Sequence, residues 1–282
     1  YQTLLRPTAT PAEVAALCQG ALKHGFAAVC VGPAYVPLAA RHLEDSPVRV
    51  CTVVGFPLGT TTRAAKAYEA EEAVRAGASE VDMVINIGFL KAGLLHEVRE
   101  EIRSVLRAVV QAAKARKTSQ AMNPPSRAPR RVAGAGANAR AEPGTHAWGD
   151  PGADPRADAG ADPGKLDRVV LVKVIIEACY LSQEEKVTAC RLAEEAGAHF
   201  VKTSTGFGPG GATVGDVRLM RQVVGDRLGV KAAGGIRRLS EALALLDAGA
   251  DRLGTSSGEA IMAELADHLG GCDWGYQEHS CS

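Results

Sequence analysis

Four apolar segments of the chain each carry one charged residue directly after a valine. The pairs are Val81-Asp82, Val172-Lys173, Val201-Lys202 and Val230-Lys231. A lysine inside an apolar strand is costly to bury, because the ammonium group loses its hydration. Three such lysines, preceded by one aspartate, indicate a cluster in which these side chains meet.

A cluster of lysines and one carboxylate has a chemical use. A lysine near its usual pKa of ~10.4 is protonated at neutral pH and is a poor nucleophile. Burial and a neighbouring cation lower that pKa, and the neutral amine can then attack an aldehyde to form a Schiff base. A nearby carboxylate can move the protons that the later steps require. The spacing alone leaves two interpretations open, which are aldol chemistry and ion pairs that only stabilise the fold.

Two glycine- and hydroxyl-rich turns follow the last two apolar segments. One reads Ala233-Gly234-Gly235-Ile236-Arg237 and the other Gly254-Thr255-Ser256-Ser257-Gly258, and each runs into a helical pattern. Helix N-termini offer free N–H groups and a positive dipole end to a phosphate, and TIM barrels often bind phosphate after strands 7 and 8. We expect a phosphate site here, although tight turns without a ligand are the alternative. The segment 202–207 (KTSTGF) is a third polar strand end.

Eight strand-like segments must position these groups. They are residues 3–5, 27–31, 48–54, 80–85, 169–176, 200–203, 230–233 and 252–254. Several are continuously apolar, which is typical of a parallel sheet covered on both faces. Aromatic residues make up only 4% of the chain, so Val, Leu, Ile and Ala must build the core.

Helical patterns with start and stop signals separate the strand candidates. Thr10-Pro11 followed by Glu13 predicts a capped helix start, and Ser182 with Glu185 predicts a second one. The tripeptide Ala-Gly-Ala recurs at 76–78, 196–198 and 248–250, where glycine suits the residue that ends a helix. Eight strand–helix units predict an α/β protein with a TIM (β/α)8 barrel, whose reactive residues lie at the C-terminal ends of the strands. An open doubly wound sheet is the alternative fold.

One segment interrupts the barrel pattern. Residues 118–164 contain no Leu, Ile, Phe or Tyr and hold seven of the fourteen prolines. Such a stretch cannot bury enough apolar surface to offset its ordering entropy, so we expect a disordered Pro/Gly/Ala-rich insertion in a single-domain protein. The barrel then divides into residues 1–117 with strands 1–4 and residues 165–269 with strands 5–8, followed by a tail at 270–282.

The composition excludes several classes of function. Lys plus Arg and Asp plus Glu are both 32, so net charge gives no reason to expect a nucleic acid or an anionic membrane as partner. No apolar run approaches the ~20 residues that span a bilayer, and no signal peptide is recognisable. The seven cysteines are odd in number and form no CxxC, which argues against a disulfide framework or a zinc site. We therefore expect a cytoplasmic protein whose cysteines act mainly as small buried apolar residues.

The motifs together resemble one enzyme family. VDMVINIG, LVKVIIE, FVKTSTGF, KAAGGIR and LGTSSG look like the strand-end motifs of the deoxyribose-phosphate aldolases, in that family's order. TVVGFPLG and TLLRPTAT match its earlier strands. The similarity covers nearly the whole chain except the insertion and the C-terminal tail, and few other families would share this set of long motifs.

The resemblance implies a class I aldolase that reversibly cleaves 2-deoxy-D-ribose 5-phosphate to acetaldehyde and D-glyceraldehyde 3-phosphate. Lys202 would form the Schiff base, Lys231 would depress the pKa of Lys202, Asp82 would donate and accept protons, and Lys173 would be a supporting charge. The phosphate would be held by Gly206, Gly234, Gly235, Ser256 and Ser257. The resemblance implies no metal or organic cofactor. The implied partners are small phosphosugars and aldehydes and, because such barrels commonly dimerise, a second copy of the chain.

Three features depart from the family pattern. Tyr1 and Gln2 stand where an Asp-His pair is usual, so the first strand is expected to be incomplete. The insertion and the tail at 270–282 are not family features either, but no proposed catalytic residue is lost. Two other functions stay open: another phosphosugar Schiff-base aldolase on the same barrel, and a non-catalytic barrel that binds a phosphometabolite.

Overall fold

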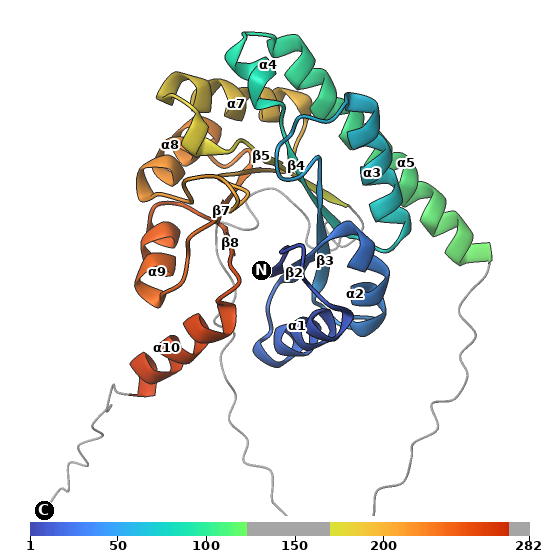
Figure 1. Cartoon of the computed structure of the whole chain (residues 1–282), viewed down its shortest axis with the longest axis vertical. Helices are drawn as coiled ribbons and strands as arrows, with labels where there is room; N and C mark the ends of the chain where they lie inside the picture. The colour runs from blue at the N-terminus through green and yellow to red at the C-terminus, as the bar shows by residue number, and fades with distance from the viewer. Residues whose placement is uncertain (123–169, 271–282) are drawn as a thin grey trace, which may run out of the picture.

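A computed structural model describes residues 1–122 and 170–270 as a closed parallel barrel surrounded by helices (Figure 1). The strands are β1 (Gln2–Leu4), β2 (Ala28–Val31), β3 (Arg49–Val54), β4 (Glu80–Val84), β5 (Leu171–Ile175), β6 (Phe200–Lys202), β7 (Gly229–Ala233) and β8 (Arg252–Gly254). Each strand pairs in parallel with the next. A parallel bridge between Gln2 and Thr255 joins β8 to β1 and closes the barrel. The predicted TIM barrel is therefore confirmed, and β1 forms even though Tyr1 and Gln2 replace the usual family pair.

Helices alternate with the strands and form the outer layer. They are α1 (Pro11–His24), α2 (Val36–His42), α3 (Arg63–Arg75), α4 (Ile87–Lys91), α5 (Leu95–Met122), α7 (Gln183–Ala196), α8 (Val214–Val224), α9 (Leu239–Asp247) and α10 (Gly258–Gly270), with 3-10 turns at Pro33–Tyr35 and Ala178–Tyr180. Helix α5 extends to Met122 and therefore runs five residues into the segment 118–164 that the composition predicts as an insertion. No proline interrupts the helix before Pro124. The rest of the predicted insertion and the tail from residue 271 lie outside the described residues.

The predicted helix signals are present in the structure. Thr10 and Ser182 each form a capping box, with Glu13 and Glu185 respectively. The central glycines of the three Ala-Gly-Ala repeats all have positive φ, which is 119° at Gly77, 90° at Gly197 and 105° at Gly249. Glycine adopts this conformation without the steric cost that a Cβ atom imposes, which explains the repeated motif. None of the helices in the described parts of the chain is long and apolar enough to cross a membrane.

A buried ion pair between α3 and α5 contacts the C-terminal end of β4. Lys66 on α3 is fully buried, and its Nζ donates to Glu101 Oε2 at 2.7 Å and to the carbonyl oxygen of Val84 at 2.8 Å. Glu101 on α5 also accepts from the backbone N–H of Asn86 at 2.5 Å. Burial lowers the pKa of Lys66 and raises that of Glu101, because both charged forms lose hydration. The pair therefore acts mainly by holding the C-terminal end of β4, the strand that carries Asp82.

A histidine between β5 and β6 predicts acid sensitivity. His199 Nδ1 accepts a hydrogen bond from the Val172 backbone N–H at 3.0 Å, so this nitrogen must be unprotonated. Burial lowers the pKa of His199 in the folded protein below its usual 6.5. The hydrogen bond of the neutral imidazole therefore stabilises the fold above pH 6.5, and this stabilisation is lost as pH falls through the folded pKa. In His199→Asn an amide oxygen can accept the same bond without titrating. We measure the free energy of unfolding in urea at pH 7 and at pH 5. Between these pH values we expect it to fall by about 1 kcal/mol more in the wild type than in the variant. Equal decreases in the two proteins would contradict this role of His199.

Candidate active site

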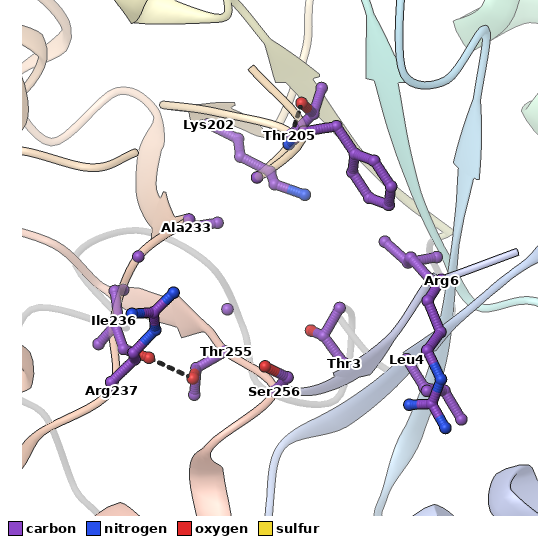
Figure 2. Close-up of a pocket in the computed structure, with 16 residues that line it drawn as sticks. Thr3, Leu4, Arg6, Lys202, Thr205, Ala233, Ile236, Arg237, Thr255 and Ser256 are labelled. Atoms are coloured by element: carbon purple, nitrogen blue, oxygen red, sulfur yellow. Dashed lines mark hydrogen bonds between the residues drawn. The ribbon is translucent and has the colours of Figure 1, made fainter. Parts of the chain in front are cut away.

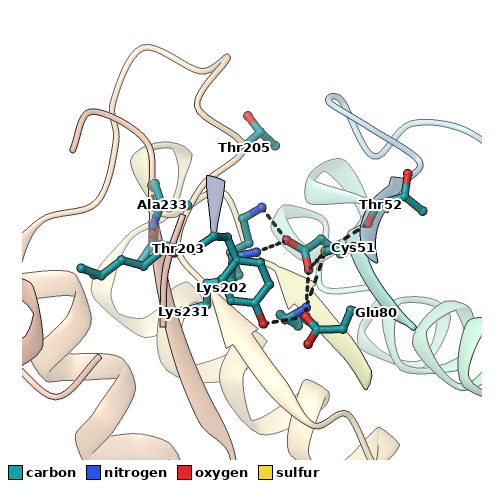
Figure 3. A network of polar contacts seen from close by, with 12 residues as sticks. Cys51, Thr52, Glu80, Lys202, Thr203, Thr205, Lys231 and Ala233 are labelled. Carbon is teal, nitrogen blue, oxygen red and sulfur yellow. Dashed lines mark hydrogen bonds and ion pairs between the residues drawn. The ribbon is translucent and has the colours of Figure 1, made fainter. Parts of the chain in front are cut away.

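The charged residues predicted from the sequence meet inside the barrel around Asp82. Asp82 Oδ2 lies 2.7 Å from Lys202 Nζ and 2.7 Å from Lys231 Nζ, and Oδ1 lies 3.0 Å from Lys173 Nζ. Asp82 has no exposed surface, and Lys202 is only 3% exposed. Figure 3 shows Lys202 and Lys231 converging on this network together with Cys51 and Glu80. One buried carboxylate is therefore shared by three lysine side chains.

The strand register places the three lysines at two depths. Lys202 pairs with Lys231 across β6 and β7, whereas Lys173 pairs with Phe200, two residues before Lys202. Lys173 therefore lies deeper in the barrel, where its Nζ also contacts Glu80 Oε2 at 2.5 Å. The side chain of Tyr1 reaches the same layer: its hydroxyl donates to Glu80, and its ring centroid lies 3.8 Å from Lys231 Nζ. Lys173 thus lies beneath the other two lysines, paired with two carboxylates.

The protonation state of Lys202 differs from the prediction. Burial is the largest influence and lowers the pKa of Lys202, but Asp82, together with Cys30 and Cys51, offsets it, and the pKa is raised above its usual value. Burial would raise the pKa of Asp82, but Lys173, Lys202 and Lys231 together hold it well below its usual range. We expected Lys231 to lower the pKa of the Lys202 amine, whereas in the site without substrate that pKa is raised. The shared carboxylate offsets the repulsion between the two ammonium groups.

A pocket of about 320 Å³ opens above Lys202 (Figure 2). The turns after β1, β6, β7 and β8 line it, which is the C-terminal face of the barrel. Of the residues predicted to hold phosphate, the structure places Gly206, Gly234, Gly235 and Ser256 in the wall. Lys202 alone of the four predicted catalytic residues also lines the pocket. The amine that reaches the cavity therefore lies between the buried carboxylate and the predicted phosphate-binding turns.

Ser257 is the one predicted phosphate residue that does not line the pocket. Its backbone N–H donates to Thr255 Oγ1 at 2.9 Å, and its carbonyl oxygen accepts from the Ile261 N–H at 3.0 Å. These bonds place Ser257 directly before α10, which begins at Gly258. The role predicted for Ser257 in phosphate binding stays a prediction, since the residue lies next to the pocket wall at the start of α10.

Sequence reasoning did not single out several residues that line the pocket. The cationic ones are Arg6, after β1, and Arg237, after β7. The hydroxyl-bearing ones are Thr3, Thr205 and Thr255. Arg237 was visible in the motif Gly-Gly-Ile-Arg, and an arginine after a phosphate-type turn is the signal that could have identified it. Arg6 could not be found in this way, because only barrel closure brings the first turn beside the last.

Two cysteines lie beside the shared carboxylate. Cys30 and Cys51 are register partners on β2 and β3, and Cys51 Sγ lies 3.3 Å from Asp82 Oδ1. A hydrogen bond from Cys51 lowers the pKa of Cys30 to about 7. Cys30, Cys51 and Asp82 are close enough to offer three ligand atoms to a metal ion. The three ammonium groups around Asp82 oppose the entry of another cation, so the donor set does not fit a metal site.

Comparison with known proteins identifies the family. A model of the DeoC/LacD family aldolases matches residues 2–116. The deoxyribose-phosphate aldolase of Carboxydothermus hydrogenoformans is 49% identical over 263 residues, which cover 93% of this chain and 92% of that protein. That of Streptococcus pneumoniae (strain CGSP14) is 46% identical over 266 residues, or 94% of each chain.

Solved structures agree with the sequence comparison. An aldolase named QR15 superposes with a TM-score of 0.72 at 32% identity, over 96% of both chains. The tetrameric deoxyribose phosphate aldolase of Aeropyrum pernix superposes with a TM-score of 0.68 at 26% identity, over 95% of this chain and 89% of that one. With a closed barrel and a buried lysine–aspartate cluster beneath its mouth, the chain belongs to the deoxyribose-phosphate aldolase family and is an aldolase.

Proposed function

We propose that the chain cleaves 2-deoxy-D-ribose 5-phosphate to acetaldehyde and D-glyceraldehyde 3-phosphate through a Schiff base on Lys202. One observation carries this proposal: Lys202 Nζ lies 2.7 Å from a buried carboxylate and also lines the open pocket. Aldol cleavage requires an amine that can contact the substrate and a carboxylate that can exchange protons with that amine.

The chemistry follows from these two groups. The Lys202 amine attacks the C1 aldehyde of the open-chain sugar, and loss of water gives an iminium. A base then removes the proton of the C3 hydroxyl, the C2–C3 bond breaks, and glyceraldehyde 3-phosphate leaves with its new carbonyl at C3. The electron pair of the broken bond enters the iminium and gives an enamine on Lys202. Protonation at C2 and hydrolysis then release acetaldehyde and the free amine.

Asp82 is the group that moves protons between these steps. Because the pKa of Lys202 is raised in the substrate-free site, the proposed mechanism begins with transfer of a proton from Lys202 Nζ to Asp82 Oδ2 across 2.7 Å. The transfer is uphill, because the pKa of Asp82 is lowered, and attack on the aldehyde consumes the neutral amine as it forms. Lys231 Nζ contacts the same carboxylate oxygen and can replace the proton that Asp82 delivers.

The far end of the pocket suits the phosphate. Gly206, Gly234 and Gly235 have φ values of 86°, 90° and 81°, and without side chains they let an oxyanion approach the backbone closely. Arg237 also lines this end, and its guanidinium has no ion-pair partner among the residues that the structure describes. A phosphate dianion is a natural partner for such a group.

Loss of the Arg237 guanidinium should weaken binding of the phosphorylated substrate selectively. We expect Arg237→Ala to raise KM for 2-deoxy-D-ribose 5-phosphate by about 10- to 100-fold, the loss of one charge-assisted contact. Turnover of unphosphorylated 2-deoxy-D-ribose should change little. The matched control is Arg238→Ala, because Arg238 pairs with Glu264 at 2.8 Å and is not part of the pocket wall. Equal effects of the two substitutions would remove Arg237 from the site.

A substrate panel tests the proposed reaction itself. The purified chain is incubated with 2-deoxy-D-ribose 5-phosphate and, separately, with hexose and ketose phosphates, and the released aldehydes are measured. We expect acetaldehyde from the deoxy sugar phosphate alone. Cleavage of another phosphosugar without acetaldehyde would indicate a different aldolase on the same barrel. Phosphate binding without any cleavage would indicate a non-catalytic barrel.

The remaining expectations concern assembly and location. The Aeropyrum pernix aldolase is a tetramer, and we propose that this chain also forms a homo-oligomer, with a dimer as its smallest form. Light scattering of the purified chain measures this directly. A cytoplasmic location is supported by the five cysteines in the described regions, all of which are free thiols.

A further inference from the structure

A carboxylate at the end of β5 lies outside the aldol mechanism described above. Glu177 is only 2% exposed, and no ion pair joins it to a cation within residues 1–122 and 170–270. A buried carboxylate without a cation needs hydrogen-bond donors in its place. The backbone N–H and hydroxyl of Thr205, in the pocket wall, supply the close donors, and the Cys179 thiol makes a longer contact with Oε1 at 3.9 Å.

The contacts tie Glu177 to the turn after β6. The Thr205 backbone N–H lies 3.2 Å from each carboxylate oxygen of Glu177, and the Thr205 hydroxyl donates to Oε2. The Phe207 N–H in turn donates to Thr205 Oγ1 at 3.0 Å. Two of the three amides in the Thr205–Gly206–Phe207 turn are therefore occupied within the protein. The Gly206 amide has no protein acceptor among the described residues, and Gly206 lines the pocket.

The backbone of Glu177 is strained in a way that suggests function. Its φ is 50° and its ψ is 65°, the left-handed region that glycine and asparagine tolerate best. A glutamate kept in this conformation contributes something that those residues cannot, and strained backbone of this kind concentrates at functional sites. The neighbouring strand ends hold it there: the Ile176 N–H donates to the Lys202 carbonyl at 3.0 Å, and the Ala178 N–H donates to the Thr203 carbonyl at 2.9 Å.

A displacement of this turn would reach the second phosphate-binding turn. A Cβ placed on Gly234 would lie only 3.3 Å from Gly206 Cα, so the two turns are in close backbone contact. The Ala212 N–H also donates to the Gly234 carbonyl at 3.0 Å. The turns that carry Gly206 and Gly234 are therefore packed against each other, so a change in the position of one requires an adjustment of the other.

We propose that Glu177 is a positioning residue that sets the phosphate-binding end of the pocket, by orienting the Thr205–Gly206–Phe207 turn so that the Gly206 amide faces the ligand. The inference rests on the proposed phosphate site, but it does not depend on which residue forms the Schiff base. Glu177 would not touch the substrate. Its effect would pass through Thr205, and it would change affinity for the phosphate group rather than chemistry at C1.

The test uses two substitutions that separate positioning from folding. Glu177→Gln keeps the size of the side chain but removes the charge and one acceptor oxygen. Glu177→Asn relieves the backbone strain and is too short to hold Thr205 in the same way. The matched control is Glu71→Gln, a glutamate on α3 that forms an ion pair with Arg75 on the same helix. Each variant is measured for melting temperature, inorganic phosphate affinity by calorimetry, and kinetics with 2-deoxy-D-ribose 5-phosphate and 2-deoxy-D-ribose.

For both Glu177 variants we expect phosphate Kd and KM for the phosphorylated sugar to rise about 10- to 100-fold, the effect of a small displacement of binding groups. We expect kcat and turnover of the unphosphorylated sugar to stay within about threefold of the wild type, and Glu177→Asn to melt no lower than the wild type. Unchanged phosphate affinity, or a lower melting temperature without any change in KM, would overturn the proposal. An equal loss on both sugars would also overturn it. A wild type that binds phosphate but cleaves neither sugar would reject the proposed function while leaving the role of Glu177 measurable.

Discussion

Lys202→Arg is expected to abolish cleavage of 2-deoxy-D-ribose 5-phosphate while leaving the barrel folded. The guanidinium can keep the ion pair that Lys202 forms with Asp82, but it stays protonated at any accessible pH and cannot form a Schiff base. We expect kcat/KM to fall by at least about 10³-fold. The measurement is the rate of acetaldehyde release, with circular dichroism to verify the fold.

A second variant excludes a purely steric explanation. Lys202→Met is close to lysine in shape and fits the buried position without the extra bulk of arginine. It should be equally inactive, because it lacks the nucleophile. A variant at position 202 that retains a tenth or more of wild-type activity would show that another amine carries the reaction.

Asp82→Asn is expected to separate formation of the Schiff base from turnover. The substitution leaves Lys173, Lys202 and Lys231 buried together without the carboxylate that they share. The pKa of Asp82 is lowered in the folded chain from the 3.8 of the unfolded chain. The ionised carboxylate therefore contributes fully to folding stability at pH 7, and this contribution is lost only as pH falls through the lower folded pKa. Its removal should reduce the free energy of unfolding by about 3–5 kcal/mol.

The two activities of the Asp82→Asn variant should move in opposite directions. Without the carboxylate, burial and the neighbouring ammonium groups lower the pKa of Lys202, so more of the amine is neutral at pH 7. Reductive trapping of an aldehyde on the variant should therefore begin at lower pH than on the wild type. Turnover should still fall by about 10²- to 10⁴-fold, because no group moves the proton. Trapping that shifts to higher pH, or wild-type turnover, would contradict this account of Asp82.

Local sequence patterns were sufficient to predict most of the fold. Alternating apolar and helical segments, the capping boxes at Thr10 and Ser182, and the Ala-Gly-Ala repeats each depend on interactions between residues close in the chain. The structure contains all of them. The extension of α5 to Met122 was not predicted, because amino-acid composition shows where apolar residues become rare and does not show where a helix ends.

The site was harder to predict where it depends on barrel closure. The three lysines and Asp82 could be predicted, because burying a charged side chain in an apolar strand costs free energy at any position of that strand in the barrel. Their relative depth depends on the strand stagger, which placed Lys173 beside Phe200 rather than Lys202. The pKa of Lys202 depends on the balance of all charges around it, and burial with a neighbouring cation does not capture the opposing effect of Asp82.

Arg6 and Glu177 illustrate what remained out of reach from the sequence. Arg6 reaches the pocket only because β1 lies beside β8. In the sequence, Glu177 is one more polar residue after a strand. No pattern among its neighbours in the sequence predicts its left-handed backbone or its contact with Thr205.

Reductive trapping of acetaldehyde on the wild-type protein tests the central claim most directly. The folded chain is incubated with acetaldehyde and borohydride, digested, and examined by peptide mass spectrometry. The account predicts one added ethyl group, on Lys202, the lysine that both contacts Asp82 and reaches the pocket. An ethyl group on Lys231 or Lys173 instead, or folded protein with no adduct on Lys202, would contradict it.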